Sequence, residues 1–162
     1  MNKQEIYDFL DRKGIRYEVT EHPALFTMEQ AASVRFPHPE AEAKNLFVRD
    51  DKKQRYYLIT VKGDKRVDLK LFRHTYQTRP LTFASPGELM ALLDLEPGSV
   101  TPLGLLNDGQ CRVELFLDQT FLDAPGMIGI HPNENTATLW MRAEDLIALV
   151  RDHGNKVSLA PI

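Results

Sequence analysis

The order of helical and extended patterns along this chain is the feature that most limits its fold. Segments with apolar residues at helical spacing and segments with alternating apolar and polar residues follow one another irregularly. A doubly wound sheet needs strict strand-helix alternation, so the sequence predicts an α+β fold with a mixed sheet. The predicted helices cover residues 2–14, 27–34, 68–77, 85–95 and 143–154, and the predicted strands cover residues 15–22, 44–50, 55–64, 79–84, 111–118, 126–131 and 136–141.

Capping residues indicate where three of these helices begin. Thr27 and Gln30 have the spacing of a capping box, and so do Ser85 and Glu88. Asp68 precedes the third helical segment and is a favourable N-cap residue, because its carboxylate accepts hydrogen bonds from free backbone N–H groups. These positions therefore predict the helix starts from local chemistry alone.

Length and composition limit the class of protein. A chain of 162 residues is long enough for one core and too short for two, so we expect one domain over residues 1–162. The first residues carry charge throughout and no run of eighteen apolar residues occurs, which argues against secretion and a membrane partner. The single cysteine, Cys111, forms no internal disulfide, and the alternation around it predicts a buried strand position. We therefore expect a cytoplasmic protein.

Positive charge is concentrated in one segment of the chain. Residues 44–79 contain eleven Lys and Arg against four Asp and Glu, a balance of +7, so the rest carries −10 within a net charge of −3. Such segregation is typical of a protein that contacts phosphates with one face. A solvated hairpin and helix surface explains it equally well, so charge alone leaves both interpretations open.

The sequence lacks the motifs of several large enzyme classes. It contains no GxGxxG, GxxxxGK[ST], GxSxG or HExxH, so dinucleotide-binding, P-loop, serine-hydrolase and zincin functions lose their usual support. The five histidines do not fall at paired metal-ligand spacing, and we predict neither a metal nor a cofactor. The context of the histidines at 22, 38, 74 and 153 favours structural roles.

Three places remain chemically unusual. The glycines and proline of PGSVTPLG, residues 97–104, hold an irregular backbone whose N–H groups could bind an oxyanion. Lys44 begins an apolar strand, where its ammonium could lie at the rim of a cavity. His131 ends a predicted strand just before a turn. Each also has an ordinary explanation, as a connecting loop, an edge lysine and a turn histidine.

Three stretches together carry a resemblance to a known family. AEAKNLFVRD at 41–50, GSVTP at 98–102 and GIHPNENTATLWM at 129–141 resemble the YbaK/ProX family of trans-acting aminoacyl-tRNA deacylases, related to the editing domain of bacterial prolyl-tRNA synthetases. The resemblance covers nearly the whole chain. The sequence is more similar to the ProX branch, which resembles the alanyl-tRNA(Pro) deacylases, than to the cysteinyl-specific YbaK branch. It implies a mixed, curved, partly barrel-like sheet with flanking helices.

The resemblance also implies a reaction. It is hydrolysis of the ester that joins a wrong amino acid to the terminal ribose of tRNA(Pro). Alanine is the favoured amino acid, and the ribose 2′-hydroxyl would help to activate or orient the attacking water. Lys44 would anchor phosphate or ribose, and His131 would line the pocket, with or without moving a proton. Cavity size would exclude proline. The loop that would hold the substrate carbonyl consists of Gly98, Ser99, Val100, Thr101 and Pro102.

The basic segment then receives an expected role. We expect it to contact the tRNA acceptor stem, with Arg79 the best candidate for a base-edge contact, because a guanidinium pairs with guanine through two hydrogen bonds. The sequence does not decide whether the protein forms a transient complex with prolyl-tRNA synthetase. Cysteinyl or seryl esters, a non-catalytic tRNA-binding module and an unrelated small-molecule-binding domain are the alternatives. The expected tRNA contacts are Arg49, Lys62, Lys65, Arg66 and Arg79.

Overall fold

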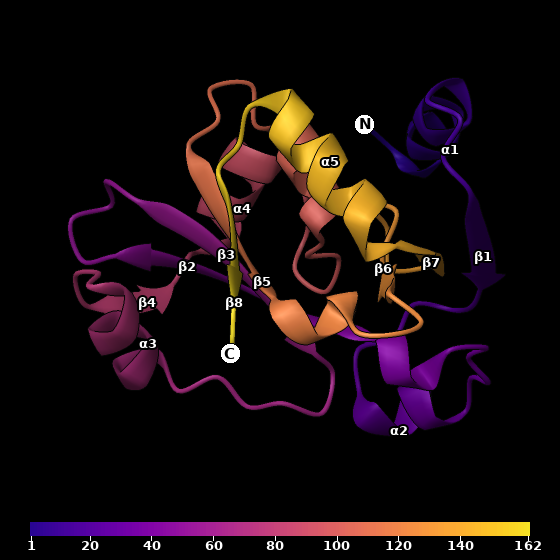
Figure 1. The fold of residues 1–162 in the computed structure, drawn as a ribbon, viewed down its shortest axis with the longest axis horizontal. Helices are drawn as coiled ribbons and strands as arrows, with labels where there is room; N and C mark the ends of the chain where they lie inside the picture. The colour runs from indigo at the N-terminus through magenta and orange to yellow at the C-terminus, as the bar shows by residue number, and fades with distance from the viewer.

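Two β-sheets and their flanking helices build the fold (Figure 1). The computed structural model describes residues 1–162, apart from the side chain of Met28. Within them, in chain order, lie α1 (Lys3–Arg12), β1 (Tyr17–Glu21), α2 (Met28–Ala32), η1 (Pro39–Ala41), β2 (Ala43–Asp50), β3 (Tyr56–Lys62), α3 (Leu69–Tyr76), β4 (Leu81–Phe83), α4 (Pro86–Leu93), η2 (Pro102–Asn107), β5 (Val113–Asp118), η3 (Gln119–Leu122), β6 (Met127–Ile130), β7 (Ala137–Arg142), α5 (Ala143–His153) and β8 (Val157–Ala160).

The larger sheet is mixed, the smaller sheet is antiparallel, and an isolated bridge connects the two. The larger sheet has the order β4-β2-β3-β5-β8, with antiparallel pairs on the β2 side and parallel β3-β5 and β5-β8 pairs. The smaller sheet, β1-β7-β6, is antiparallel. An isolated bridge between Glu42 and Gly129 joins the two. This open arrangement, without a closed barrel among the described residues, confirms the predicted α+β class.

Apolar side chains fill both faces of the larger sheet. The main cluster packs α4, α5 and the smaller sheet against one face, and a second cluster packs α3 against the other, as the placement of these helices in Figure 1 shows. Burial of each large apolar side chain contributes about 1.5–3 kcal/mol. Residues of β2 alternate between the faces, with Phe47 in the main cluster and Val48 in the second.

The three predicted capping arrangements are confirmed. Thr27 and Gln30 form a reciprocal capping box at α2, and Ser85 and Glu88 form one at α4. The Asp68 carboxylate accepts hydrogen bonds from two backbone N–H groups at the start of α3. The starts of these three helices are therefore set by side-chain oxygens that accept hydrogen bonds from backbone N–H groups of the first turn, as the sequence predicted.

Three features differ from the sequence expectations. β8 was not expected, because its four residues gain their hydrogen bonds only by parallel pairing with a distant strand, β5. Cys111 was expected on a strand but precedes β5, with a φ of 52° and its thiol against His153. The loop at residues 96–109 also contains η2, whose Leu103 and Leu105 are fully buried.

Candidate active site

A small cavity lies where the two sheets meet. Its volume is about 200 Å³, below the range of about 300–1,000 Å³ that ligand pockets usually have. Its walls are mostly apolar, and His131 and Glu42 are the ionisable side chains among them. The cavity is therefore suited to one small group that carries few polar atoms. Its lining residues are Leu25, Ala31, Phe36, Glu42, Ala43, Gly129, Ile130, His131, Asn135 and Thr138.

His131 follows the end of β6 and is held by the neighbouring strand. Its Nδ1 lies 2.9 Å from the Ala137 carbonyl, which only accepts, so Nδ1 carries the proton and donates. Burial lowers the pKa of His131 below its usual 6.5; the Ala137 carbonyl opposes this shift and nearby His22 adds to it. The imidazole is therefore neutral at pH 7, and the Nε2 lone pair is able to accept a proton.

The loop from Gly98 to Pro102 is tied to this histidine. The Thr101 hydroxyl donates to the His131 carbonyl at 2.7 Å, and Ser99, Thr101 and Pro102 are buried. Gly98 has a φ of 88°, which bends the loop in a way that side chains disfavour. Within the described part of the chain, the N–H groups of Val100 and Thr101 donate no hydrogen bond. The structure thus brings together two of the three unusual places in the sequence.

Asn135 lies between the small cavity and a larger one. It lines both, and the larger cavity has a volume of about 600 Å³ and includes Ser99 and Phe26 in its walls. The Asn135 Nδ2 donates to the Leu25 carbonyl at 2.6 Å, while its buried Oδ1 accepts no hydrogen bond from any residue that the structure describes. Because Phe26 is 70% exposed, an aromatic ring stands at the mouth of the larger cavity. The two cavities thus adjoin at Asn135.

His22 belongs to this site, although its sequence context favoured a purely structural role. Its Nε2 lies 3.0 Å from the Thr138 hydroxyl and its Nδ1 lies 2.8 Å from the Pro23 carbonyl. Its ring centroid is 6.2 Å from that of His131. With both nitrogens engaged, His22 supports the cavity wall. The residues next to His22 in the chain gave no signal of this role, because it is β1-β7 pairing that places His22 beside residues 136–138.

The structure does not bring Lys44 to His131. Because side chains alternate along β2, Lys44 lies on the same face of the strand as Val48. Ala43, which lines the small cavity, lies on the other face. Its side chain is exposed, and its Nζ lies 3.5 Å from the Lys65 carbonyl. An anchoring role for Lys44 stays a prediction and would require phosphate or ribose to reach that face.

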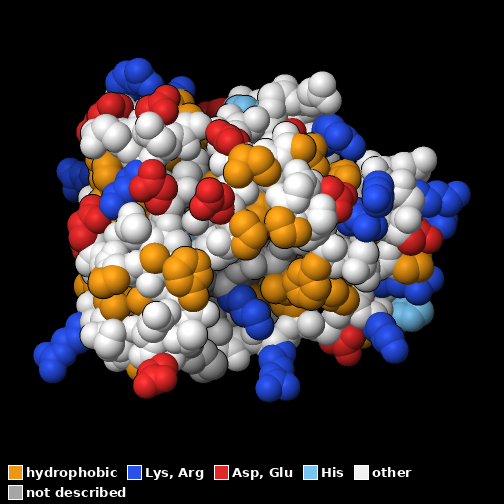
Figure 2. Space-filling model, turned by 180° about the vertical axis from the view of Figure 1, so that it is seen from behind, with side chains coloured by type: hydrophobic (Ala, Val, Ile, Leu, Met, Phe, Trp, Pro, Cys, Tyr) orange, Lys and Arg blue, Asp and Glu red, His pale blue; other side chains and the backbone are white. Residues whose placement is uncertain are grey.

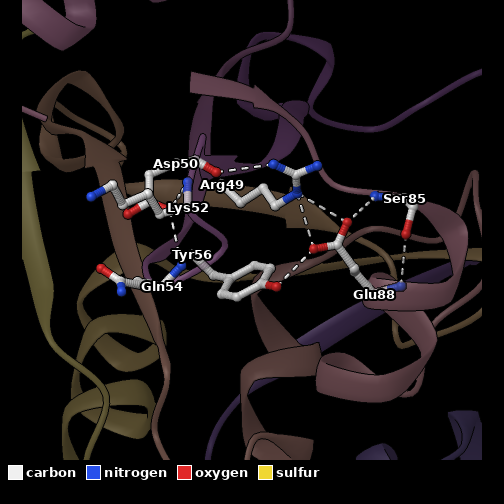
Figure 3. A network of polar contacts seen from close by, with 7 residues as sticks. All are labelled: Arg49, Asp50, Lys52, Gln54, Tyr56, Ser85 and Glu88. Carbon is white, nitrogen blue, oxygen red and sulfur yellow. Dashed lines mark hydrogen bonds and ion pairs between the residues drawn. The ribbon is translucent and has the colours of Figure 1, made fainter. Parts of the chain in front are cut away.

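Arg49, one of the expected tRNA contacts, is engaged within the chain (Figure 3). It forms an ion pair with Glu88 at 3.0 Å, and the Tyr56 hydroxyl donates to the same carboxylate at 2.7 Å. Burial acts to raise the pKa of Glu88, but these bonds and the Ser85 backbone N–H outweigh it and hold the pKa at about 2. Arg49 therefore stabilises the junction of β2, β3 and α4.

Three more of the expected contacts also have partners within the chain, whereas exposed Arg66 forms no ion pair among the described residues. Figure 2 shows Lys and Arg side chains gathered on the side of the molecule that carries the β2–β3 hairpin and α3. Basic groups thus remain on this side. Lys62 donates to the Glu40 carbonyl at 3.2 Å, Lys65 pairs with buried Asp118 at 2.6 Å, and Arg79 pairs with Asp51 at 2.7 Å.

Two classes of site are absent from the described residues. No group of three His, Cys, Asp or Glu side chains there could hold a metal ion. No described helix is both long and apolar enough to cross a membrane.

The fold and this site define an α+β domain with a small cavity beside a partly buried, neutral histidine. A model of the aminoacyl-tRNA editing domain family matches residues 22–149. The chain is 34% identical over 153 residues to the prolyl-tRNA editing protein ProX of Acetoanaerobium sticklandii, covering 94% of this chain and 93% of that protein. The chain therefore belongs to the aminoacyl-tRNA editing domain family, and the resemblance noted from its motifs is confirmed.

Two further comparisons agree. The chain is 33% identical over 161 residues to prolyl-tRNA synthetase associated domain-containing protein 1 of Mus musculus, covering 94% of this chain and 92% of that protein. A solved structure of a candidate trans-editing enzyme for prolyl-tRNA synthetase superposes with a TM-score of 0.72 at 24% identity, covering 97% and 94% of the two chains. That structure supports the fold.

Proposed function

We propose that this chain is a trans-editing deacylase that hydrolyses alanyl-tRNA(Pro). Its family and its similarity to a prolyl-tRNA editing protein support the class of reaction, hydrolysis of a mischarged aminoacyl-tRNA ester. The observation that carries the choice of alanine is the small cavity, with Ala31, Ala43 and Gly129 in its walls. One methylene changes binding by about 1–3 kcal/mol, so a tight wall is needed to exclude proline.

The reaction needs positioning more than a strong nucleophile. Water adds to the ester carbonyl carbon, the bond to the ribose oxygen breaks, and the products are the free amino acid and the tRNA 3′-terminal ribose. The neutral Nε2 of His131 is suited to accept the proton of water or of the ribose 2′-hydroxyl and to return it to the leaving oxygen. The N–H groups of Val100 and Thr101 are suited to stabilise the negative charge on the carbonyl oxygen.

Ester loss from four charged tRNAs tests this function. The protein is incubated with Ala-, Ser-, Cys- and Pro-tRNA(Pro), and release of each amino acid is followed. We expect the alanyl ester to be hydrolysed fastest and the prolyl ester to be spared. Preferred loss of the cysteinyl or seryl ester would change the substrate assignment, and no loss of any ester would leave a non-catalytic tRNA-binding module as the better description.

The pH dependence of deacylation tests the role of His131. Because its pKa lies below 6.5 in the folded chain, the rate above the uncatalysed background should fall only below pH 6.5, approaching tenfold per pH unit. Because of the same pKa shift, the free energy of unfolding should be highest above pH 6.5 and should decrease as the pH falls below it. The reason is that His131 of the unfolded chain takes up a proton at a higher pH than His131 of the folded chain. The rate profile of His131→Gln should lack the acid limb, and an unchanged limb would show that His131 does not move the proton.

Arg66 offers the clearest test of tRNA contact by the basic segment. We expect Arg66→Gln to raise KM about threefold to tenfold and to reduce the slope of log KM against log salt by about one, as loss of one phosphate contact does. The matched control is Arg12→Gln, an exposed arginine on α1 outside that segment. Equal salt slopes for Arg66→Gln and the wild type would remove Arg66 from the interface.

Lys65 is unsuitable for the same experiment. It pairs with Asp118, whose carboxylate is fully buried. Removing one partner of a buried pair costs about 3–5 kcal/mol, so loss of activity on changing Lys65 would reflect unfolding as much as tRNA binding. A transient complex with prolyl-tRNA synthetase stays a prediction.

A further inference from the structure

Glu42 is an acidic residue in an otherwise mostly apolar cavity. It lines the same 200 Å³ space as His131, together with small or apolar neighbours such as Ala43 and Ile130. Within the described part of the chain, its carboxylate accepts no hydrogen bond and forms no ion pair. The reaction described above does not use this carboxylate.

The backbone of Glu42 is held in place on two sides. Its carbonyl accepts a hydrogen bond from the Gly63 N–H at 2.9 Å, and it forms the bridge to Gly129 that joins the two sheets. Trp140 packs so closely on Gly129 that a Cβ there would lie 2.3 Å from the indole ring. The bridge therefore has little freedom to move, and Glu42 keeps a defined position at the cavity.

A partly buried carboxylate without a protein partner is less well hydrated than one on the open surface, so a cationic ligand would stabilise it. Partial burial raises the pKa of Glu42 above its ordinary value, in keeping with an apolar setting. A ligand cation would replace the lost hydration and favour the ionised form. The other ionisable wall residue, His131, is neutral at pH 7 and would not repel that cation.

We propose that Glu42 binds the α-ammonium group of the aminoacyl moiety and so restricts the enzyme to esters with a free amino group. This inference rests on the proposed function. An alanyl ester has one cationic group, attached to the carbon next to the reacting carbonyl, and a cavity this small brings that group close to its walls. N-blocked esters, such as peptidyl-tRNA, have no ammonium and are poor substrates.

Two esters and one isosteric substitution test the proposal. Wild type and Glu42→Gln are assayed on Ala-tRNA(Pro) and on N-acetyl-Ala-tRNA(Pro), which lacks the ammonium. The wild type should prefer the free-amino ester at least tenfold in kcat/KM. Glu42→Gln should lose about tenfold on Ala-tRNA(Pro) and nothing on the acetylated ester, and Glu42→Asp should retain part of the preference. The control Glu40→Gln changes an exposed carboxylate outside the cavity lining and should leave both rates unchanged.

The outcomes separate this inference from the function on which it rests. Equal losses of Glu42→Gln on both esters, or no loss on either, would overturn ammonium binding while deacylation stands. A wild type that hydrolyses neither ester would overturn the proposed function and this inference with it. Thermal unfolding of each variant shows that the compared proteins are folded.

Discussion

Replacement of Gly98 with alanine is expected to lower kcat/KM for Ala-tRNA(Pro) by about 100- to 1,000-fold, the loss typical of a damaged oxyanion site. Gly98 has a φ of 88°, and a Cβ there would lie 3.2 Å from the Phe26 ring and 3.4 Å from Asn135 Nδ2. Relief of these contacts moves the loop whose Val100 and Thr101 N–H groups face no partner in the described chain. Single-turnover deacylation measures the effect.

Gly14→Ala is the matched control for this variant. Gly14 also has a positive φ, 69°, but a Cβ there meets no atom within 4 Å. Both substitutions carry a backbone cost of about 1–2 kcal/mol, so they should lower the free energy of unfolding similarly. Only Gly98→Ala should lose activity. Full activity in Gly98→Ala would refute a catalytic role for the loop geometry.

Gly129→Ala is expected to give the largest loss of stability, about 3 kcal/mol in the free energy of unfolding. The new Cβ would lie 2.3, 2.6 and 2.9 Å from three ring atoms of Trp140, which is fully buried and cannot move aside without shifting β7. The strain would fall on the β6-β7 pair that positions His131. Urea denaturation followed by tryptophan fluorescence measures it.

Gly109→Ala serves as the control for overpacking, because Gly109 is exposed and a Cβ there meets no atom within 4 Å. Its free energy of unfolding should change by less than about 1 kcal/mol. If Gly129→Ala unfolds at the same urea concentration as the wild type, the close packing of Trp140 on Gly129 is not as described.

The parts of the fold that depend on neighbouring residues could be predicted from the sequence. The capping boxes at Thr27 and Ser85 bind backbone groups within one turn, so the same few residues contain both donor and acceptor. β8 shows the opposite case. Its residues Val157–Ala160 have little strand signal of their own and are extended because β5, some forty residues earlier in the chain, offers an open edge.

The candidate site divides in the same way. His131 and the irregular backbone at Gly98 were visible as local departures from regular patterns, and Thr101 joins them through one hydrogen bond. His22 contacts the wall residue Thr138 only through pairing of β1 with β7, and Glu42 is held at the cavity by its bridge to Gly129. The residues that neighbour His22 and Glu42 in the chain do not indicate either contact.

The sequence by itself determined the helix starts, the β2–β3 hairpin, the bent loop at Gly98 and the family resemblance, because each depends on residues close together in the chain. Only the tertiary structure decided which residues share a cavity. Strand alternation turned Lys44 away from His131, and burial made His131 neutral while leaving Glu42 without a partner among the described residues. Electrostatics of this kind depends on which distant segments exclude water, and that is settled when the two sheets pack together.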